Sequence, residues 1–170
     1  MDGQLTHLMV DQNPGRESVF RVVAGLRRVS PLTHGAFSLD VMIHAALLNA
    51  LLHYRGRQEK SADLLGISWR TLYRRLERIR NGDQGDGRVI GQLALGLRQI
   101  FPTTDGAAHL GLLLQATLIC GMIHCAGVKS RAADFLGITR VTLDRMLASQ
   151  HVQQAASEML ERLQGVGYEN

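Results

Sequence analysis

Cysteine, proline and aromatic residues are scarce in this chain of 170 residues. It contains two cysteines, three prolines and 5% aromatic residues. Cys120 and Cys125 stand five residues apart on one apolar stretch, where a disulfide between them would be strained, so a disulfide framework is excluded and a reducing cytoplasm is expected. With so few aromatics, Leu, Ile, Val, Met and Ala must fill the core. That composition suits the packing of helices.

Long apolar runs are missing as well, and we expect no signal peptide. The most apolar stretch, 39–52, is interrupted by Asp40, His44 and Asn49, so we expect no transmembrane helix. Residues 1–15 lack the basic start and apolar run of a signal peptide. No serine–histidine–aspartate set, phosphate loop or acidic nuclease cluster is visible. An enzyme is therefore the least favoured class, and we expect no catalytic residue and no cofactor.

A metal site has one weak candidate. Cys120 and His124 are four residues apart, which would place both on one face of a helix, and Cys125 follows directly. The sequence offers no second pair of ligands, and the surrounding residues are apolar. A core role is favoured over zinc binding, so we expect no metal site.

Charge is unevenly distributed along the chain. The formal net charge is +4, but residues 19–80 carry eleven Lys or Arg against four Asp or Glu, whereas residues 90–150 carry five against three. The last twenty residues have one basic residue against three acids. A positive field concentrated on one half of the chain suits a polyanionic partner.

Residues 58–80 predict a helix-turn-helix. A short helix over 58–65 is followed by a turn on Gly66-Ile67-Ser68 and by a second helix from Trp69 to about Arg80. Gly66 can adopt the positive φ that a tight helix exit needs, and Ser68 is a typical N-cap. The second helix contains five arginines and one acid. This combination is typical of a helix that enters a major groove of DNA.

The same pattern occurs twice. Shifting the sequence by 71 residues aligns 19–79 with 90–150 without a gap, with 21 identities in 61 positions, and about a third of the other pairs are apolar in both copies. We interpret this as a tandem duplication and call 19–79 repeat one and 90–150 repeat two. Residues 81–87, NGDQGDG, contain three glycines and no apolar residue, which predicts a linker.

The segment HYRGRQEKSADLLGISWRTLYRRLERI resembles the DNA-binding end of the Fis family, which is shared with the C-terminal domains of NtrC-type activators. Each repeat also has room for the two longer helices that Fis places before its helix-turn-helix. The resemblance covers about 130 residues, as two Fis-like units in one chain. The motif is stronger in repeat one than in repeat two.

The resemblance implies a set of DNA-binding residues, which we carry over by position. Base readers would be Ser68, Trp69, Thr71, Tyr73 and Arg74 in repeat one, and Thr139, Arg140, Thr142, Asp144 and Arg145 in repeat two. Phosphate contacts would be Arg55, Arg57, Lys60, Arg70, Arg75, Arg78 and Arg80 in repeat one, and Lys129, Arg131, Arg140 and Arg145 in repeat two. A solvated basic face without a ligand is the alternative.

Three positions depart from the family pattern. Trp69 stands where the family usually has arginine, so the bidentate contact to guanine is lost, although the ring could pack on a thymine methyl or a sugar edge. Asp144 stands where a basic residue is usual and would face a negatively charged groove. Met146 replaces Arg75 in the alignment. Repeat two is therefore expected to bind DNA more weakly, and a protein-binding role for it stays open.

The expected fold is all-α, with two tandem four-helix units: 16–80, and 88–150 after the linker 81–87. Its helices are expected at about 16–29, 37–54, 88–100, 107–125, 129–136 and 140–149, besides the two of 58–80, with an extra C-terminal helix at 151–165. The helix pairs of 16–54 and 88–125 could form one shared core, giving a single-chain pseudo-dimer. A true homodimer of two chains is the alternative.

These expectations lead to a functional hypothesis. The chain would be a cytoplasmic, nucleoid-associated bacterial protein that binds double-stranded DNA as a transcriptional regulator, and the resemblance to Fis implies bending of the duplex. The alternative is an adaptor whose repeat two binds a transcription or recombination component. A second copy of the chain is a further partner to consider, and no membrane partner is expected.

Overall fold

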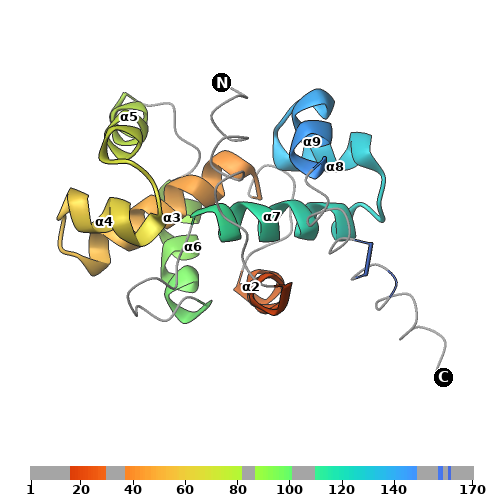
Figure 1. Ribbon diagram of the computed structural model, residues 1–170, viewed down its shortest axis with the longest axis horizontal. Helices are drawn as coiled ribbons and strands as arrows, with labels where there is room; N and C mark the ends of the chain where they lie inside the picture. Colours follow the sequence, from red (N-terminus) through yellow and green to blue (C-terminus); the bar gives the residue numbers. More distant parts are fainter. Residues whose placement is uncertain are drawn as a thin grey trace.

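A computed structural model describes residues 16–29, 37–81, 87–100, 110–148, 157, 158 and 161. Within this part of the chain the structure consists of helices and turns, so the predicted all-α class is confirmed (Figure 1). The helices are α2 (Arg16–Val29), α3 (Leu39–His53), α4 (Gln58–Leu65), α5 (Trp69–Arg80), α6 (Gly87–Ile100), α7 (Leu110–His124), α8 (Lys129–Leu136) and α9 (Arg140–Leu147).

The helix bounds agree with the predicted ones to within three residues at each end. The main differences are at the linker and the C-terminus. Helix α6 already includes Gly87, which we expected in the linker, and residues 82–86 lie outside the described residues. Of the predicted helix 151–165, only residues 157, 158 and 161 are described, and all three are helical. The C-terminal helix therefore stays a prediction.

The four long helices form one core by packing across the two repeats. Helix α2 packs mainly on α7, and α3 packs mainly on α6, so each of these pairs joins repeat one to repeat two. Helices α3 and α7 run through the middle of the molecule (Figure 1) and are apolar on nearly every side, since each is surrounded by other helices. The two repeats are thus interlocked, as the pseudo-dimer hypothesis expects.

Two glycines at equivalent repeat positions show how closely α2 and α6 approach each other. A Cβ atom added to Gly25 would lie 2.8 Å from Cγ1 of Ile100, and one added to Gly96 would lie 3.0 Å from Cβ of Val29. Residues 25 and 96 are related by the repeat shift of 71, and so are residues 29 and 100. The contact is therefore reciprocal, as in an isologous interface between two subunits.

The helix-turn-helix of repeat two is also anchored to repeat one. The ring of Phe37, just before α3, stacks on Phe135 of α8 with 5.3 Å between ring centroids. In the core, the Cys120 thiol points at the carbonyl oxygen of Val23 across 3.7 Å. Removing either repeat would therefore expose a large apolar surface on the other, and we do not expect either half to fold alone.

Candidate nucleic-acid interface

Helices α4 and α5 form the helix-turn-helix of repeat one. Gly66 ends α4 with φ of 69°, in the left-handed region that glycine adopts without strain, and its amide reaches back to the carbonyl of Ala62. Ser68 begins α5 by accepting a hydrogen bond from the amide of Thr71 at 3.2 Å. Leu65 and Leu72 are buried and hold the two helices together. The predicted turn and cap are confirmed.

Repeat two builds the same turn from its own residues. Gly137 ends α8 with φ of 68°, and Thr139 accepts from the amide of Thr142 at 3.2 Å at the start of α9. In both copies the capping hydroxyl also bonds the hydroxyl of the threonine three residues later, at 2.8 Å. The bond between the two hydroxyls uses one of their two O–H groups, so the other O–H of each pair stays available as a donor.

A second pair of turns connects the core to each helix-turn-helix. Arg55 and Ala126, at equivalent positions, adopt φ of 53° and 52°, and the glycines that follow them have φ of 81° and 79°. Positive φ is unfavourable for residues with a Cβ atom, by about 1 kcal/mol. Both repeats accept this strain, and in both the amide of the following glycine bonds a carbonyl of the preceding long helix at 2.8 Å.

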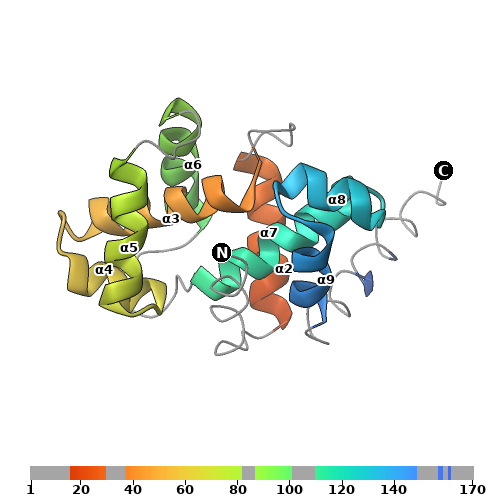
Figure 2. The same ribbon diagram turned by 90° about the horizontal axis from the view of Figure 1, so that it is seen from above.

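Helices α5 and α9, the second helix of each helix-turn-helix, lie on the same side of the molecule. In Figure 1, α5 and α9 occupy opposite ends of the upper side, while α2 and α6 lie on the other side of α3 and α7. Figure 2, the view from above, again shows α4 with α5 at one end and α8 with α9 at the other. The shared core therefore presents both helices in one direction, which is the arrangement needed to face a single duplex.

The outward face of α5 combines arginines with aromatic rings. Arg70, Arg74 and Arg80 are exposed, and so are Trp69 and Tyr73, whose rings stack on each other with centroids 5.7 Å apart. A hydrogen bond to the Glu77 carboxylate is the main cause that raises the pKa of the Tyr73 hydroxyl. The phenol therefore stays protonated at neutral pH.

Arg75 does not lie on this face. Its side chain is buried, with the residue 4% exposed, and it points toward the carboxylate of Asp40 at the start of α3, with 3.7 Å between Nη1 and Oδ1. Burial lowers the pKa of the Arg75 guanidinium, and the nearby Asp40 carboxylate opposes only part of this shift. In repeat two, Met146 and Gly111 occupy the equivalent positions, and Met146 is buried too. This position belongs to the core in both repeats, so we remove Arg75 from the set of phosphate contacts.

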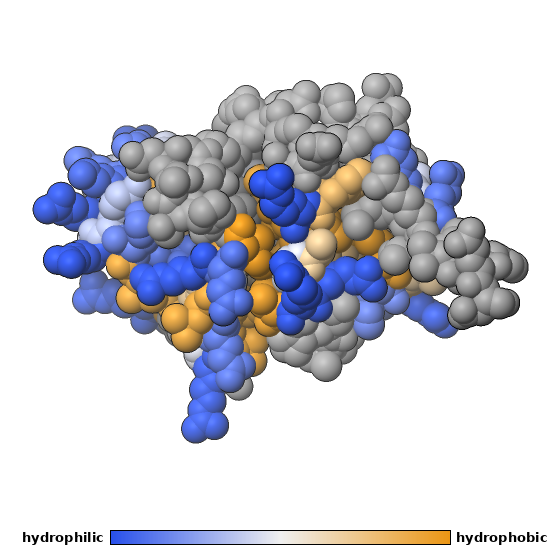
Figure 3. All heavy atoms as spheres, turned by 90° about the horizontal axis from the view of Figure 1, so that it is seen from below, coloured by the Kyte–Doolittle hydropathy of each residue, from blue (hydrophilic) through white to orange (hydrophobic). Residues whose placement is uncertain are grey.

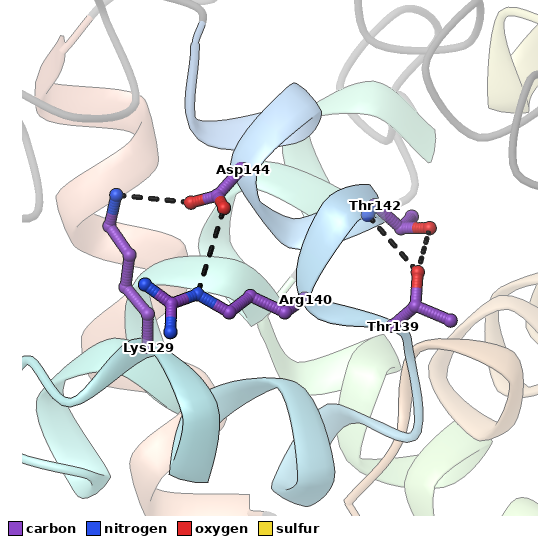
Figure 4. A network of polar contacts seen from close by, with 5 residues as sticks. All are labelled: Lys129, Thr139, Arg140, Thr142 and Asp144. Atoms are coloured by element: carbon purple, nitrogen blue, oxygen red, sulfur yellow. Dashed lines mark hydrogen bonds and ion pairs between the residues drawn. The ribbon is translucent and has the colours of Figure 1, made fainter.

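The outward face of α9 is less positive than that of α5 because Asp144 pairs with two of its neighbouring cations. Its Oδ1 accepts from Nζ of Lys129 at 3.1 Å, and its Oδ2 lies 3.8 Å from Nε of Arg140 (Figure 4). The three residues come from the first turn of α8 and from α9, so the network also links these two helices. Lys129 and Arg140 were both expected to meet phosphate or bases. In this structure the single negative charge of Asp144 compensates one of their two positive charges.

The remaining predicted residues fall into three groups by exposure. Besides those already placed on α5, the exposed ones are Arg55, Arg57, Lys60, Ser68, Arg131, Thr139, Arg140 and Arg145. Thr71, Arg78 and Lys129 are partly buried, whereas Thr142 is fully buried. Thr142 therefore supports the start of α9 and does not reach a groove, and we remove it from the set of base readers.

Cys120 and His124 of α7, and Cys125 directly after it, are placed as structural residues. Both cysteines are free, and burial raises the pKa of Cys120 to about 12. The ring of His124 stacks on Phe135 with centroids 4.5 Å apart. Among the residues that the structure describes, no three side chains of the His, Cys, Asp or Glu type come together in a way that could hold a metal ion.

Two functional features escaped the sequence analysis. Asp40 was treated only as an interruption of an apolar stretch, although it is the partner of Arg75. The self-alignment contained a signal, because Arg75 and Asp40 are replaced together, by Met146 and Gly111, in repeat two. The ion pair between Asp144 and Lys129 could not be predicted from the sequence, since the two residues belong to different helices and are fifteen positions apart.

Comparison with known proteins agrees with this geometry. The model of a family described as "Bacterial regulatory protein, Fis family" matches residues 44–78 and 118–149. The two matches end 71 residues apart, at the repeat shift, and each ends within or just after the second helix of a helix-turn-helix. Searches of the curated proteins and of the solved structures gave no match. Each repeat of the chain therefore contains a segment that is similar to the Fis family of bacterial regulatory proteins.

Proposed function

We propose that this protein is a cytoplasmic, nucleoid-associated regulator that binds one duplex with both helix-turn-helices and bends it. The observation that carries the proposal is the shared core, which presents α5 and α9 on one side of the molecule (Figure 1). Helix-turn-helix pairs read half-sites about one helical turn apart, and a duplex that follows two such helices is often bent. The expected partner is double-stranded DNA.

The two halves would contribute unequally to binding. Helix α5 exposes Arg70, Arg74 and Arg80, whereas α9 exposes Arg145 and an Arg140 that is paired with Asp144. Repeat one would therefore supply most of the phosphate contacts and of the salt-dependent affinity. A symmetric dimer of identical chains must present identical helices, and a fused pair need not. The favoured target is accordingly an asymmetric site, with repeat two bound to the weaker half.

Fusion also changes how the binding unit assembles. Two separate subunits pair only above their dissociation constant, whereas two halves of one chain meet at a high effective concentration at any dilution. The interlocked contacts of α2 with α7 and of α3 with α6 are those of such an assembly. DNA affinity should then show no dependence on a prior dimerisation step.

Anisotropy of labelled duplex DNA across a salt series tests the proposal. Arg74→Ala and Arg145→Ala remove equivalent exposed arginines from α5 and α9, and Arg98→Ala removes an exposed arginine from α6 as a control. Binding should weaken steeply with salt, most in Arg74→Ala, less in Arg145→Ala and not in Arg98→Ala. Binding that is absent, or that no salt concentration weakens, would contradict the proposal.

One observation favours an adaptor role for repeat two as a second candidate. Val141 on α9 is 61% exposed at the position where α5 has Arg70, and an apolar side chain of this kind suits a protein partner better than a phosphate. Since the core is shared, deleting repeat two would also disrupt repeat one. Val141→Arg is the better test: it should strengthen DNA binding if α9 faces the duplex, and leave it unchanged if α9 binds protein.

The described helices also bear on a membrane role. In the ranges given above for the structure, no helix is long and apolar enough to cross a bilayer. Apolar side chains nevertheless reach the surface in the middle of the side opposite α5 and α9 (Figure 3). Leu95 of α6 is among the exposed apolar residues of the molecule. Nothing in the structure shows what covers them, so they enter neither proposal.

A further inference from the structure

Helix α5 carries an exposed pair of aromatic residues, Trp69 and Tyr73. Trp69 is 53% exposed and Tyr73 is 44% exposed, and their rings lie nearly parallel, 25° apart. They stand one turn apart at the start of α5, where a recognition helix enters a groove. Large aromatic surfaces left in water are unfavourable unless a ligand covers them.

An intact duplex does not offer these rings a matching surface. In the major groove only the edges of the bases and the thymine methyl groups are accessible, because each base face is covered by its neighbours in the stack. Stacking on an aromatic side chain requires a base whose face is free, as in a single strand or an unpaired bubble. Such stacking tolerates any base, because every base has an aromatic face.

The positive charges needed to hold a strand lie on the same helix as the rings. Arg70 stands three residues before Tyr73 and four before Arg74, so these side chains are neighbours on the surface of α5, and both arginines are exposed. Proteins that bind single strands combine a basic surface that tracks the phosphates with aromatic residues that stack the bases. The same four residues thus supply both parts of such a site.

We propose that Trp69 and Tyr73 form a stacking platform for unpaired bases, which gives repeat one a preference for single-stranded or locally opened DNA over fully paired duplex. This inference rests on the proposed DNA binding and adds a ligand class to it. Repeat two lacks the platform, because Arg140 and Asp144 occupy the two equivalent positions. The preference therefore belongs to one half of the molecule only.

Trp69 is the one tryptophan of the chain, so its fluorescence reports the platform directly. The probes are a thymidine oligonucleotide, a paired duplex, and the same duplex with a short bubble of unpaired thymines. Intact protein should show quenched tryptophan emission on the oligonucleotide and the bubble, and about tenfold tighter binding to the bubble than to the paired duplex. Emission should change little on the paired duplex.

Two variants make the result specific. Trp69→Arg, which copies the residue of repeat two, should abolish the preference for the bubble while duplex binding is kept or strengthened. Tyr73→Leu should reduce the preference, with Trp69 still present as the reporter. Leu95→Ser, which changes an exposed apolar residue of α6, should leave both binding and preference unchanged and serves as the matched control.

The remaining outcomes separate this inference from the proposed function. Equal affinity for bubble and paired duplex, with no quenching, would overturn the stacking platform and leave duplex binding intact. Weaker binding when deoxyuridine replaces thymine in the paired duplex, lost in Trp69→Arg and without a bubble preference, would overturn it in favour of methyl reading. Failure to bind any of the three probes would overturn the proposed function itself.

Discussion

Replacing Asp144 by asparagine should increase the part that repeat two plays in DNA binding. The carboxylate holds Lys129 at 3.1 Å and lies 3.8 Å from Arg140. Asparagine keeps the shape of the side chain and removes its charge, so both cations become available to phosphate. The variant also removes a negative charge from α9, which lies on the same side of the molecule as α5 (Figure 1).

The structure sets the size of both expected effects. Exposed fractions of 41%, 45% and 65% for the side chains of Lys129, Asp144 and Arg140 make these surface pairs, worth about 0–1 kcal/mol to folding stability. Each new phosphate contact steepens the dependence of log K on log salt concentration by about 0.9, so two freed cations should add ~1.8 to the slope. The salt dependence of DNA binding should therefore change clearly, whereas the free energy of unfolding should hardly change.

Anisotropy titrations at four or more salt concentrations measure that slope. Asp134→Asn is the matched control, since it makes the same change of charge on the exposed side of α8 and Asp134 forms no ion pair in the described part of the chain. A steeper slope in Asp144→Asn alone supports a duplex contact by repeat two. Equal slopes in both variants and the parent protein would refute the reasoning and leave α9 off the DNA.

Three further predictions concern the core. Gly96→Ala should lower the free energy of unfolding by about 1 kcal/mol, because the added methyl group overpacks the contact with Val29. Gly91→Ala in the same helix has open space around it and should raise the free energy of unfolding by about 0.5–1 kcal/mol. Urea unfolding of both variants measures the difference. Arg75→Met, which introduces the residue found in repeat two, should leave DNA affinity unchanged. It should maintain or raise the melting temperature, because buried ion pairs are often replaceable by apolar residues. A loss of DNA affinity would contradict the burial of the Arg75 side chain. Burial raises the pKa of Cys120 to about 12, above the value of about 8.5 in an unfolded chain, so the free energy of unfolding should fall as pH rises from about 9 toward 12. At pH 8 a thiol reagent should modify the half-buried Cys125 and should leave Cys120 unmodified until the protein unfolds.

Local structure was predictable because local residues determine it. A glycine that allows positive φ, followed by a hydroxyl residue that caps the next helix, defines each helix-turn-helix, and both copies were placed from the sequence. The duplication added the prediction of a shared core. Helix ends near the linker were less certain, since Gly87 and its neighbours fit a turn as well as the first turn of a helix.

Side-chain burial on the second helices was harder to predict. An arginine-rich helix suggests that every arginine faces the ligand, but Arg75 lies on the side that packs against α3, with Asp40 as its partner. The helical position alone would have indicated this, because Leu72 and Arg75 are three residues apart and share a face. The resemblance placed Trp69 and Tyr73 among the base readers, but the stacking of their rings could not be predicted from the sequence.

The stoichiometry of the DNA complex tests the central claim most directly. Native mass spectrometry of the free protein, and of its complex with a duplex of about 25 base pairs that spans two half-sites, gives the number of chains in each. The account predicts one 18.7 kDa chain free in solution and one chain per duplex, at all protein concentrations. Two chains on each duplex, or a free dimer that must form before DNA binds, would contradict it.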